Sequence, residues 1–112
     1  EVPTAAGFAS SASGFAALAA ASSRAIGLEL SDEELSRLTR QGSGSACRSI
    51  YGGFVEWEMG TRSDGLDSHA ISVAPASHWD VRVAAVVLSA TEKKVSSRAG
   101  MKRTVETSPF YQ

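Results

Sequence analysis

The chain has 112 residues, the length of one domain, and its 43% hydrophobic content is enough to build the core of a soluble protein. Eleven basic and twelve acidic residues leave a net charge of −1, which argues against binding of nucleic acid or an anionic membrane through an overall positive field. The single cysteine, Cys47, excludes an internal disulfide and a zinc site of clustered cysteines, and this cysteine usage suits the reducing cytoplasm.

A loop of small residues leads into a helix start at residues 3–12, which read Pro-Thr-Ala-Ala-Gly-Phe-Ala-Ser-Ser-Ala. Gly7 can adopt a positive φ and expose the N–H groups of its neighbours. The hydroxyls of Ser10 and Ser11 can cap the helix or reach a phosphate or its Mg²⁺. The segment therefore indicates a nucleotide phosphate site, and the alternative is an ordinary turn followed by an N-cap.

The first helix is predicted over residues 10–26. Four residues recur there at helical spacing among many alanines: Phe15, Leu18, Ser22 and Ile26. Gly27 is expected to end this helix. The apolar run within it, residues 15–21, is far shorter than the roughly 20 residues that cross a bilayer, so we expect no membrane span.

A second helix is predicted from Ser31 to about Gln41. Ser31 and Glu34 have the spacing of a capping box, and the acidic first turn complements the helix dipole. Its buried edge is expected to consist of Leu35 and Leu38.

The next segment, residues 42–49, reads Gly-Ser-Gly-Ser-Ala-Cys-Arg-Ser. Small residues allow backbone N–H groups to approach an anion, and Ser43 and Ser45 can donate hydrogen bonds. Arg48 adds a planar fork suited to a carboxylate or a phosphate. A flexible Gly-Ser connector is the alternative, although the immediate continuation into a strand argues against a free linker.

Three strands are predicted after this segment. Residues 53–59 alternate in the manner of a half-buried strand, and Ile71 and Val73 mark a second one. Residues 81–88 are apolar apart from Arg82, which predicts a strand covered on both faces at the centre of the sheet.

Basic and hydroxyl residues follow at 93–98, Lys-Lys-Val-Ser-Ser-Arg, ahead of a helix expected to stop near Pro109. A turn between a strand and a helix is a frequent anion site, because the helix N-terminus favours negative charge. The alternative is a solvated basic turn with a serine N-cap, which is the better interpretation of these six residues alone.

Other residues give weaker indications of a functional site. His69 and His78 have no further ligand residues around them, so we expect no metal site there. The neighbouring arginine could depress the pKa of Cys47, but no base is near in sequence, and we expect a small packed residue. Trp57 and Trp79 are interpreted as core or rim aromatic residues.

Residues 3–13, 42–57 and 96–108 together resemble the diphosphomevalonate decarboxylases of the GHMP kinase superfamily. The run Gly-Ser-Gly-Ser-Ala-Cys-Arg-Ser-Ile-Tyr-Gly-Gly-Phe-Val-Glu-Trp is the most specific part, because related small-molecule kinases share only the first loop. The resemblance implies an α/β (α+β) fold, a two-layer GHMP kinase N-terminal domain of the ribosomal protein S5 domain 2-like type. It also implies that residues 1–112 are an incomplete internal fragment of that domain, with the C-terminal domain absent.

The resemblance further implies a reaction in which ATP, with Mg²⁺, phosphorylates the tertiary hydroxyl of mevalonate 5-diphosphate, and loss of phosphate and CO₂ yields isopentenyl diphosphate. The enzyme would be a cytoplasmic homodimer. The ATP phosphates would be held by Pro3, Thr4, Ala5, Ala6, Gly7, Phe8, Ala9, Ser10, Ser11 and Ala12, with Ser10 or Ser11 near Mg²⁺. The substrate would be held by Ser43, Gly44, Ser45, Ala46, Cys47, Arg48, Ser97 and Arg98. Arg48 would orient the departing carboxylate.

The family's catalytic aspartate belongs to a later segment and its lysine-bearing substrate motif to an earlier one, so the 112 residues alone are expected to be inactive. Two alternatives share the fold: a GHMP small-molecule kinase and a decarboxylase that acts on the monophosphate. A non-enzymatic RNA-associated module is a third alternative, which the net charge of −1 argues against.

Overall fold

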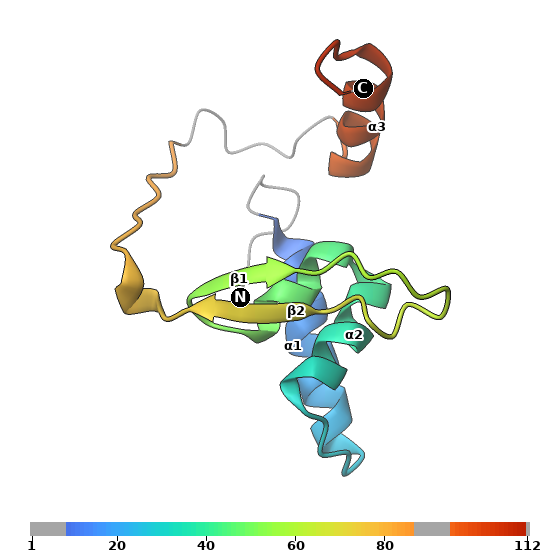
Figure 1. The fold of residues 1–112 in the computed structure, drawn as a ribbon, viewed down its shortest axis with the longest axis vertical. Coiled ribbons are helices and arrows are strands. Elements are labelled where there is room, and N and C mark those ends of the chain that lie inside the picture. The colour runs from blue at the N-terminus through green and yellow to red at the C-terminus, as the bar shows by residue number, and fades with distance from the viewer. Residues whose placement is uncertain (1–8, 87–94, 112) are drawn as a thin grey trace.

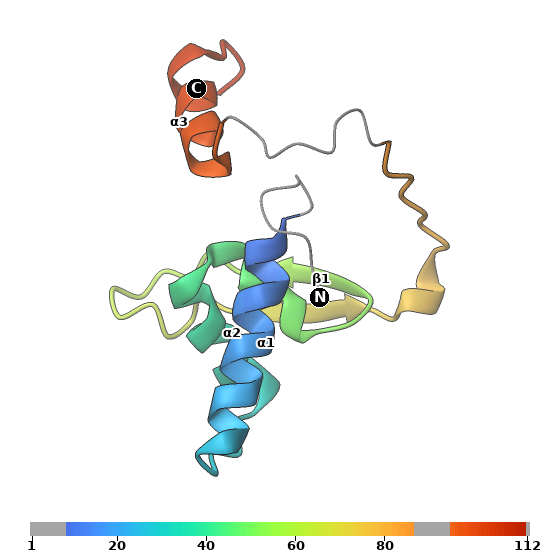
Figure 2. The ribbon, with the colours of Figure 1, turned by 180° about the vertical axis from the view of Figure 1, so that it is seen from behind.

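The computed structural model describes residues 9–86 and 95–111. Its elements in chain order are α1 (Ser10–Ala25), α2 (Asp32–Gly42), the 3₁₀ helix η1 (Gly44–Ile50), β1 (Phe54–Trp57), β2 (Ala70–Ala74), the 3₁₀ helix η2 (Ala76–His78) and α3 (Ser97–Thr107). In Figure 1 the β1–β2 pair lies in front of α1 and α2, and Figure 2 shows α1 crossing the opposite side. This part of the chain is therefore a two-layer α/β structure, as the sequence predicted.

Helix α1 forms where the sequence predicted a helix, and Gly27, with φ of +77°, follows its end. The N-cap is Ala9, with φ of +50°, and the described residues provide no side-chain cap for it. Ser10 and Ser11, which the sequence offered as caps, therefore do not cap this helix, because they already lie in its first turn.

Small residues form the buried side of α1, chiefly Ala16 and Ser23. Phe15, Leu18 and Ile26, which set the predicted pattern, keep much of their surface exposed. Because short side chains allow close packing, α1 contacts both α2 and η1.

The capping box predicted for α2 is confirmed. The hydroxyl of Ser31 accepts a hydrogen bond from the backbone N–H of Glu34 at 3.3 Å, and the Glu34 carboxylate accepts one from the backbone N–H of Ser31 at 2.8 Å. The hydrogen bond from the Ser31 backbone N–H, and after it one that the Ser31 hydroxyl donates to the same carboxylate at 2.7 Å, lower the pKa of the Glu34 carboxyl. The contribution of this charge to stability is thus present above the ordinary pKa of glutamate and is lost as the pH falls through the lowered value.

Replacing Ser31 with alanine is expected to destabilise the complete protein by about 1 kcal/mol, because the N–H of Glu34 loses its acceptor. Urea unfolding at neutral pH measures the loss. Glu34→Gln is the matched control, since it keeps an acceptor for the Ser31 N–H but has no charge to titrate. A Ser31→Ala protein as stable as the wild type would contradict a stabilising role for the cap.

The buried edge predicted for α2 is wrong at Leu38, whereas Leu35 is half-buried. Leu38 is 42% exposed, whereas Ser36 and Thr39 are buried at 0% and 2% exposure. The Ser36 hydroxyl donates to the carbonyl of Cys47 at 3.0 Å and accepts from the backbone N–H of Ala70 at 2.8 Å. A buried hydroxyl is stable when it is hydrogen-bonded, and here it joins α2 to both η1 and β2.

Strands β1 and β2 pair antiparallel, with Trp57 opposite Ala70 and an irregularity between Phe54 and Val55. Gly53, just before β1, has φ of +80°, and a side chain there would collide with the backbone carbonyl of Ala74. The turn into β1 therefore requires glycine.

The central strand predicted at residues 81–88 is wrong over 81–86, where no strand forms. Val83 is 90% exposed. A strand buried on both faces needs neighbouring strands and a layer on each side, and the described residues supply only the two-stranded β1–β2 sheet. Residues 87 and 88 lie outside the described residues.

The helix expected before Pro109 is confirmed as α3. Its N-cap is Ser96, whose hydroxyl accepts from the N–H of Ala99 at 3.2 Å. In both Figure 1 and Figure 2, α3 stands apart from the layers formed by α1, α2 and the strands. In the part of the chain that the structure describes, no helix has the length and apolar character of a membrane span.

Candidate functional site

The segment predicted as an anion-binding loop is largely the 3₁₀ helix η1. Ser43 has an extended backbone and links the end of α2 to the start of η1, and its carbonyl accepts from the N–H of Ala46 at 2.8 Å. Helices α1 and α2 and both strands contact η1. Residues 43–48, which are expected to hold a substrate, thus occupy the middle of the described fold, as a fixed turn and not as a free linker.

Side chains of this segment divide into buried and exposed ones. Ala46 and Cys47 are completely buried, backbone included, so neither residue presents a group at the surface. The side chain of Arg48, the next residue, is exposed. The segment therefore holds a surface guanidinium on a turn that is anchored from beneath.

Burial raises the pKa of the Cys47 thiol, and the attraction of Arg48 for the thiolate offsets only part of this effect. The arginine lowers this pKa as predicted, but the pKa as a whole is raised, because desolvation of the thiolate outweighs the neighbouring charge. The expectation of a small packed residue is confirmed.

An aromatic ring lies beneath Arg48. The guanidinium carbon is 5.8 Å from the centre of the Trp57 ring, within the range of a cation–π interaction. The indole N–H of Trp57 donates to the hydroxyl of Ser68 at 3.2 Å, and that hydroxyl donates to the carbonyl of Glu58 at 3.1 Å. Trp57 is 39% exposed, which confirms the interpretation as a rim aromatic, but its pairing with Arg48 and the part of Ser68 were not predicted.

The described end of the predicted phosphate segment consists of Ala9, Ser10, Ser11 and Ala12, at the beginning of α1. Its other members, Pro3, Thr4, Ala5, Ala6, Gly7 and Phe8, lie outside the described residues. The ring of Phe15 packs so closely on Gly42 that no side chain would fit there. The early turns of α1 therefore lie against the start of the segment that contains Arg48.

Ser97 and Arg98 lie in the first turn of α3. Because α3 stands apart in both views (Figures 1 and 2), the structure does not bring these two residues beside η1. Lys93 and Lys94 lie outside the described residues.

The two histidines make other contacts. The Nε2 atom of His69 is 3.6 Å from the carboxylate of Glu33, and the ring of His78 meets the ring of Phe54 edge-on at 5.8 Å between centres. Across residues 9–86 and 95–111, no group of three or more His, Cys, Asp or Glu residues is arranged to hold a metal ion.

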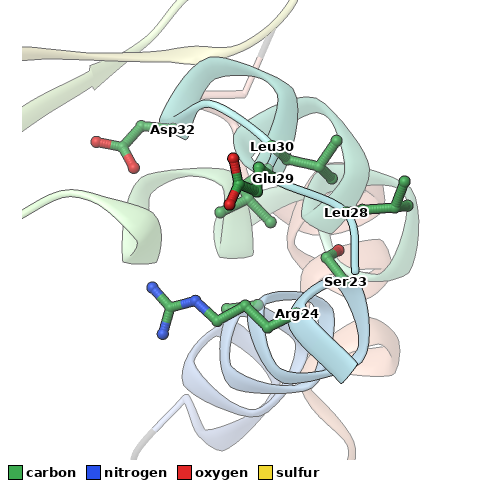
Figure 3. Close-up of a pocket in the computed structure, with 8 residues that line it drawn as sticks. Ser23, Arg24, Leu28, Glu29, Leu30 and Asp32 are labelled. Carbon is green, nitrogen blue, oxygen red and sulfur yellow. The ribbon is translucent and has the colours of Figure 1, made fainter. Parts of the chain in front are cut away.

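A hollow of about 400 Å³ lies between the end of α1 and the start of α2. Figure 3 shows the charged side chains of Arg24, Glu29 and Asp32 around it. None of the predicted site residues lines this hollow. The candidate site is therefore the surface of η1 around Arg48.

Comparisons with known proteins agree on one family. The model of the diphosphomevalonate decarboxylase-like N-terminal domain matches residues 1–70. The chain is 57% identical over 111 residues to the diphosphomevalonate decarboxylase of Ganoderma lucidum and 56% identical over 109 residues to that of Homo sapiens. It spans only 28% and 26% of the lengths of these relatives, which cover 98% and 96% of it.

Solved structures give the same result. A crystal structure of mevalonate 5-diphosphate decarboxylase superposes with a TM-score of 0.73 at 45% identity, and the match covers 99% of this chain and 29% of that one. The complex of MDDEF with MVAPP, AMPPCP and magnesium has a TM-score of 0.72 at 54% identity, with 99% and 34% of the two chains covered.

Proposed function

Because the chain belongs to the diphosphomevalonate decarboxylase-like family, with the GHMP kinase fold of its structural neighbours, we propose that it is part of the N-terminal domain of a longer enzyme. That enzyme decarboxylates mevalonate 5-diphosphate to isopentenyl diphosphate with consumption of ATP. The observation that carries this proposal is the identity above 50% to curated decarboxylases over nearly all of the chain.

The proposed reaction has two steps. The γ-phosphoryl group of ATP passes to the tertiary hydroxyl, whose proton goes to a base elsewhere in the enzyme. The C–O bond to this phosphate then breaks, and the electrons of the bond to the carboxylate form the new double bond as CO₂ leaves. Such chemistry depends mainly on positioning and on neutralisation of charge.

Arg48 is the residue to which we assign the carboxylate. Its guanidinium is exposed on η1 and forms no ion pair or hydrogen bond with another described residue, so its paired donors are available to a ligand within this part of the protein. A planar fork holds a carboxylate in one orientation. Ser43, Gly44 and Ser45 would complete this side of the substrate site, and the buried Ala46 and Cys47 would support it from beneath.

The start of α1 suits phosphate. Because the described residues give α1 no side-chain cap, the N–H groups of Ser10 and Ser11 can serve an anion, whereas that of Ala12 donates to the Ala9 carbonyl at 3.1 Å. Ser10 and Ser11 add hydroxyls that fit an ATP-bound Mg²⁺, which would supply positive charge. MDDEF binds AMPPCP and magnesium, and we assign the ATP phosphates here to residues 3–12.

Three further assignments belong to this proposal. Ser97 and Arg98 would contact the substrate diphosphate, which requires α3 to lie beside η1 in the complete protein. The complete enzyme would be a homodimer, and it would work in the cytoplasm. Its catalytic aspartate would lie outside the 112 residues.

Product analysis of the complete protein tests the function. We expect ATP-dependent release of CO₂ from mevalonate 5-diphosphate, and none from the 112-residue chain by itself. Phosphorylation without CO₂ would identify a small-molecule kinase, and a preference for the 5-phosphate would identify the sister decarboxylase. Salt-sensitive RNA binding without nucleotide binding would support the non-enzymatic alternative.

A further inference from the structure

The indole of Trp57 is held in place from two sides. Its N–H donates to Ser68, and a Cβ added at Gly44 would come within 2.8 Å of the ring. Trp57 ends β1, whereas Gly44 begins η1, so the ring is enclosed between the strand and the turn. This ring is therefore a fixed surface and not a free side chain.

Arg48 is the cation above that surface. An exposed arginine has many rotamers, and ordering it costs conformational entropy. An acidic partner would order it but would occupy the donors that a substrate carboxylate needs. An aromatic face attracts the cation through the ring quadrupole and leaves the N–H groups at the guanidinium edge unoccupied.

We propose that Trp57 is the positioning residue for Arg48. It acts on the substrate only through the arginine, by limiting where the guanidinium lies, and Ser68 supports it by fixing the indole. This inference rests on the proposed function, because it takes the substrate carboxylate as the group that Arg48 binds.

A double-mutant cycle in the complete enzyme tests the proposal. We expect Trp57→Leu, which removes the aromatic face, to weaken mevalonate 5-diphosphate binding about threefold to tenfold, in line with a cation–π contact at a partly exposed site. Trp57→Phe keeps a ring and is expected to restore most of the affinity. The KM for ATP should stay within about twofold of the wild type, because the ring contacts the arginine that we assign to the substrate carboxylate and not to ATP.

The decisive arm is the Arg48→Met background, measured as the dissociation constant of mevalonate 5-diphosphate by calorimetry. If Trp57 acts through Arg48, Trp57→Leu has no further effect there. An equal loss in both backgrounds would overturn the proposal, as would unchanged affinity in the single variant. Ser68→Ala, which keeps the indole, provides the same cycle should Trp57→Leu fail to fold. A wild-type enzyme without decarboxylase activity would instead refute the proposed function, independently of this coupling.

Discussion

Replacing Arg48 with methionine in the complete enzyme is expected to lower kcat/KM for mevalonate 5-diphosphate roughly 10²- to 10³-fold, the scale seen when one preorganised donor is removed from an active site. Methionine keeps the length of the side chain but has no charge and no donors. Arg48→Lys keeps the charge but lacks the planar fork. Its kcat/KM should lie between those of the wild type and Arg48→Met, because a lysine cannot bind a carboxylate through two parallel hydrogen bonds. Steady-state kinetics with CO₂ release as the readout measures both.

The matched control is Arg24→Met, which removes an exposed arginine in the last turn of α1. Its kcat/KM should equal that of the wild type. Because Arg48 is exposed, the melting temperature of Arg48→Met should also remain near the wild-type value. An Arg48→Met enzyme with wild-type kcat/KM would show that the carboxylate is bound elsewhere.

Replacing Ser36 with alanine is expected to cost about 2–3 kcal/mol of stability, because it leaves a buried N–H and a buried carbonyl without their partner. Those groups are the N–H of Ala70 and the carbonyl of Cys47. Chemical unfolding of the complete protein measures the free energy, and hydrogen exchange at Ala70 locates the effect. We also expect a raised KM for mevalonate 5-diphosphate, because the same hydroxyl holds η1.

Ser22→Ala is the control for this variant, since Ser22 is an exposed serine on α1 and its replacement should change stability by less than about 0.5 kcal/mol. Equal stability of the two variants would mean that the hydroxyl bridge contributes nothing measurable. Unchanged exchange at Ala70 would exclude its amide from the bridge in solution.

Sequence patterns predicted the elements better than their packing. Helices α1, α2 and α3 carry local signals, such as the Ser31–Glu34 capping box, that need no knowledge of distant residues. The burial of Ser36 could not be predicted in this way, because its hydroxyl pairs with an N–H that is 34 residues away. Apolar pattern alone also failed at residues 81–86, where a strand requires partners that the described sheet lacks.

The candidate site, too, was only partly predictable from local sequence. Small residues around one arginine identify Arg48 from local composition, because they suit an anion. The ring beneath it comes from β1, and the hydroxyl that fixes that ring comes from Ser68, just before β2. The hydrogen bond to Ser68 depends on the register of the β1–β2 pair, which the hydrophobic pattern sets only together with the turn geometry. The contact with Arg48 depends on how β1 packs against η1, which no local pattern shows.

The buried thiol of Cys47 can be used to measure how often η1 opens. The thiolate is the nucleophile that attacks alkylating reagents, and this sulfur is both enclosed and difficult to ionise. Iodoacetamide can therefore modify it only during the moments when η1 lifts away from the helices. The labelling rate at this one position, followed by mass spectrometry, would measure how often the turn that carries Arg48 opens, and a bound substrate that clamps the turn would slow it.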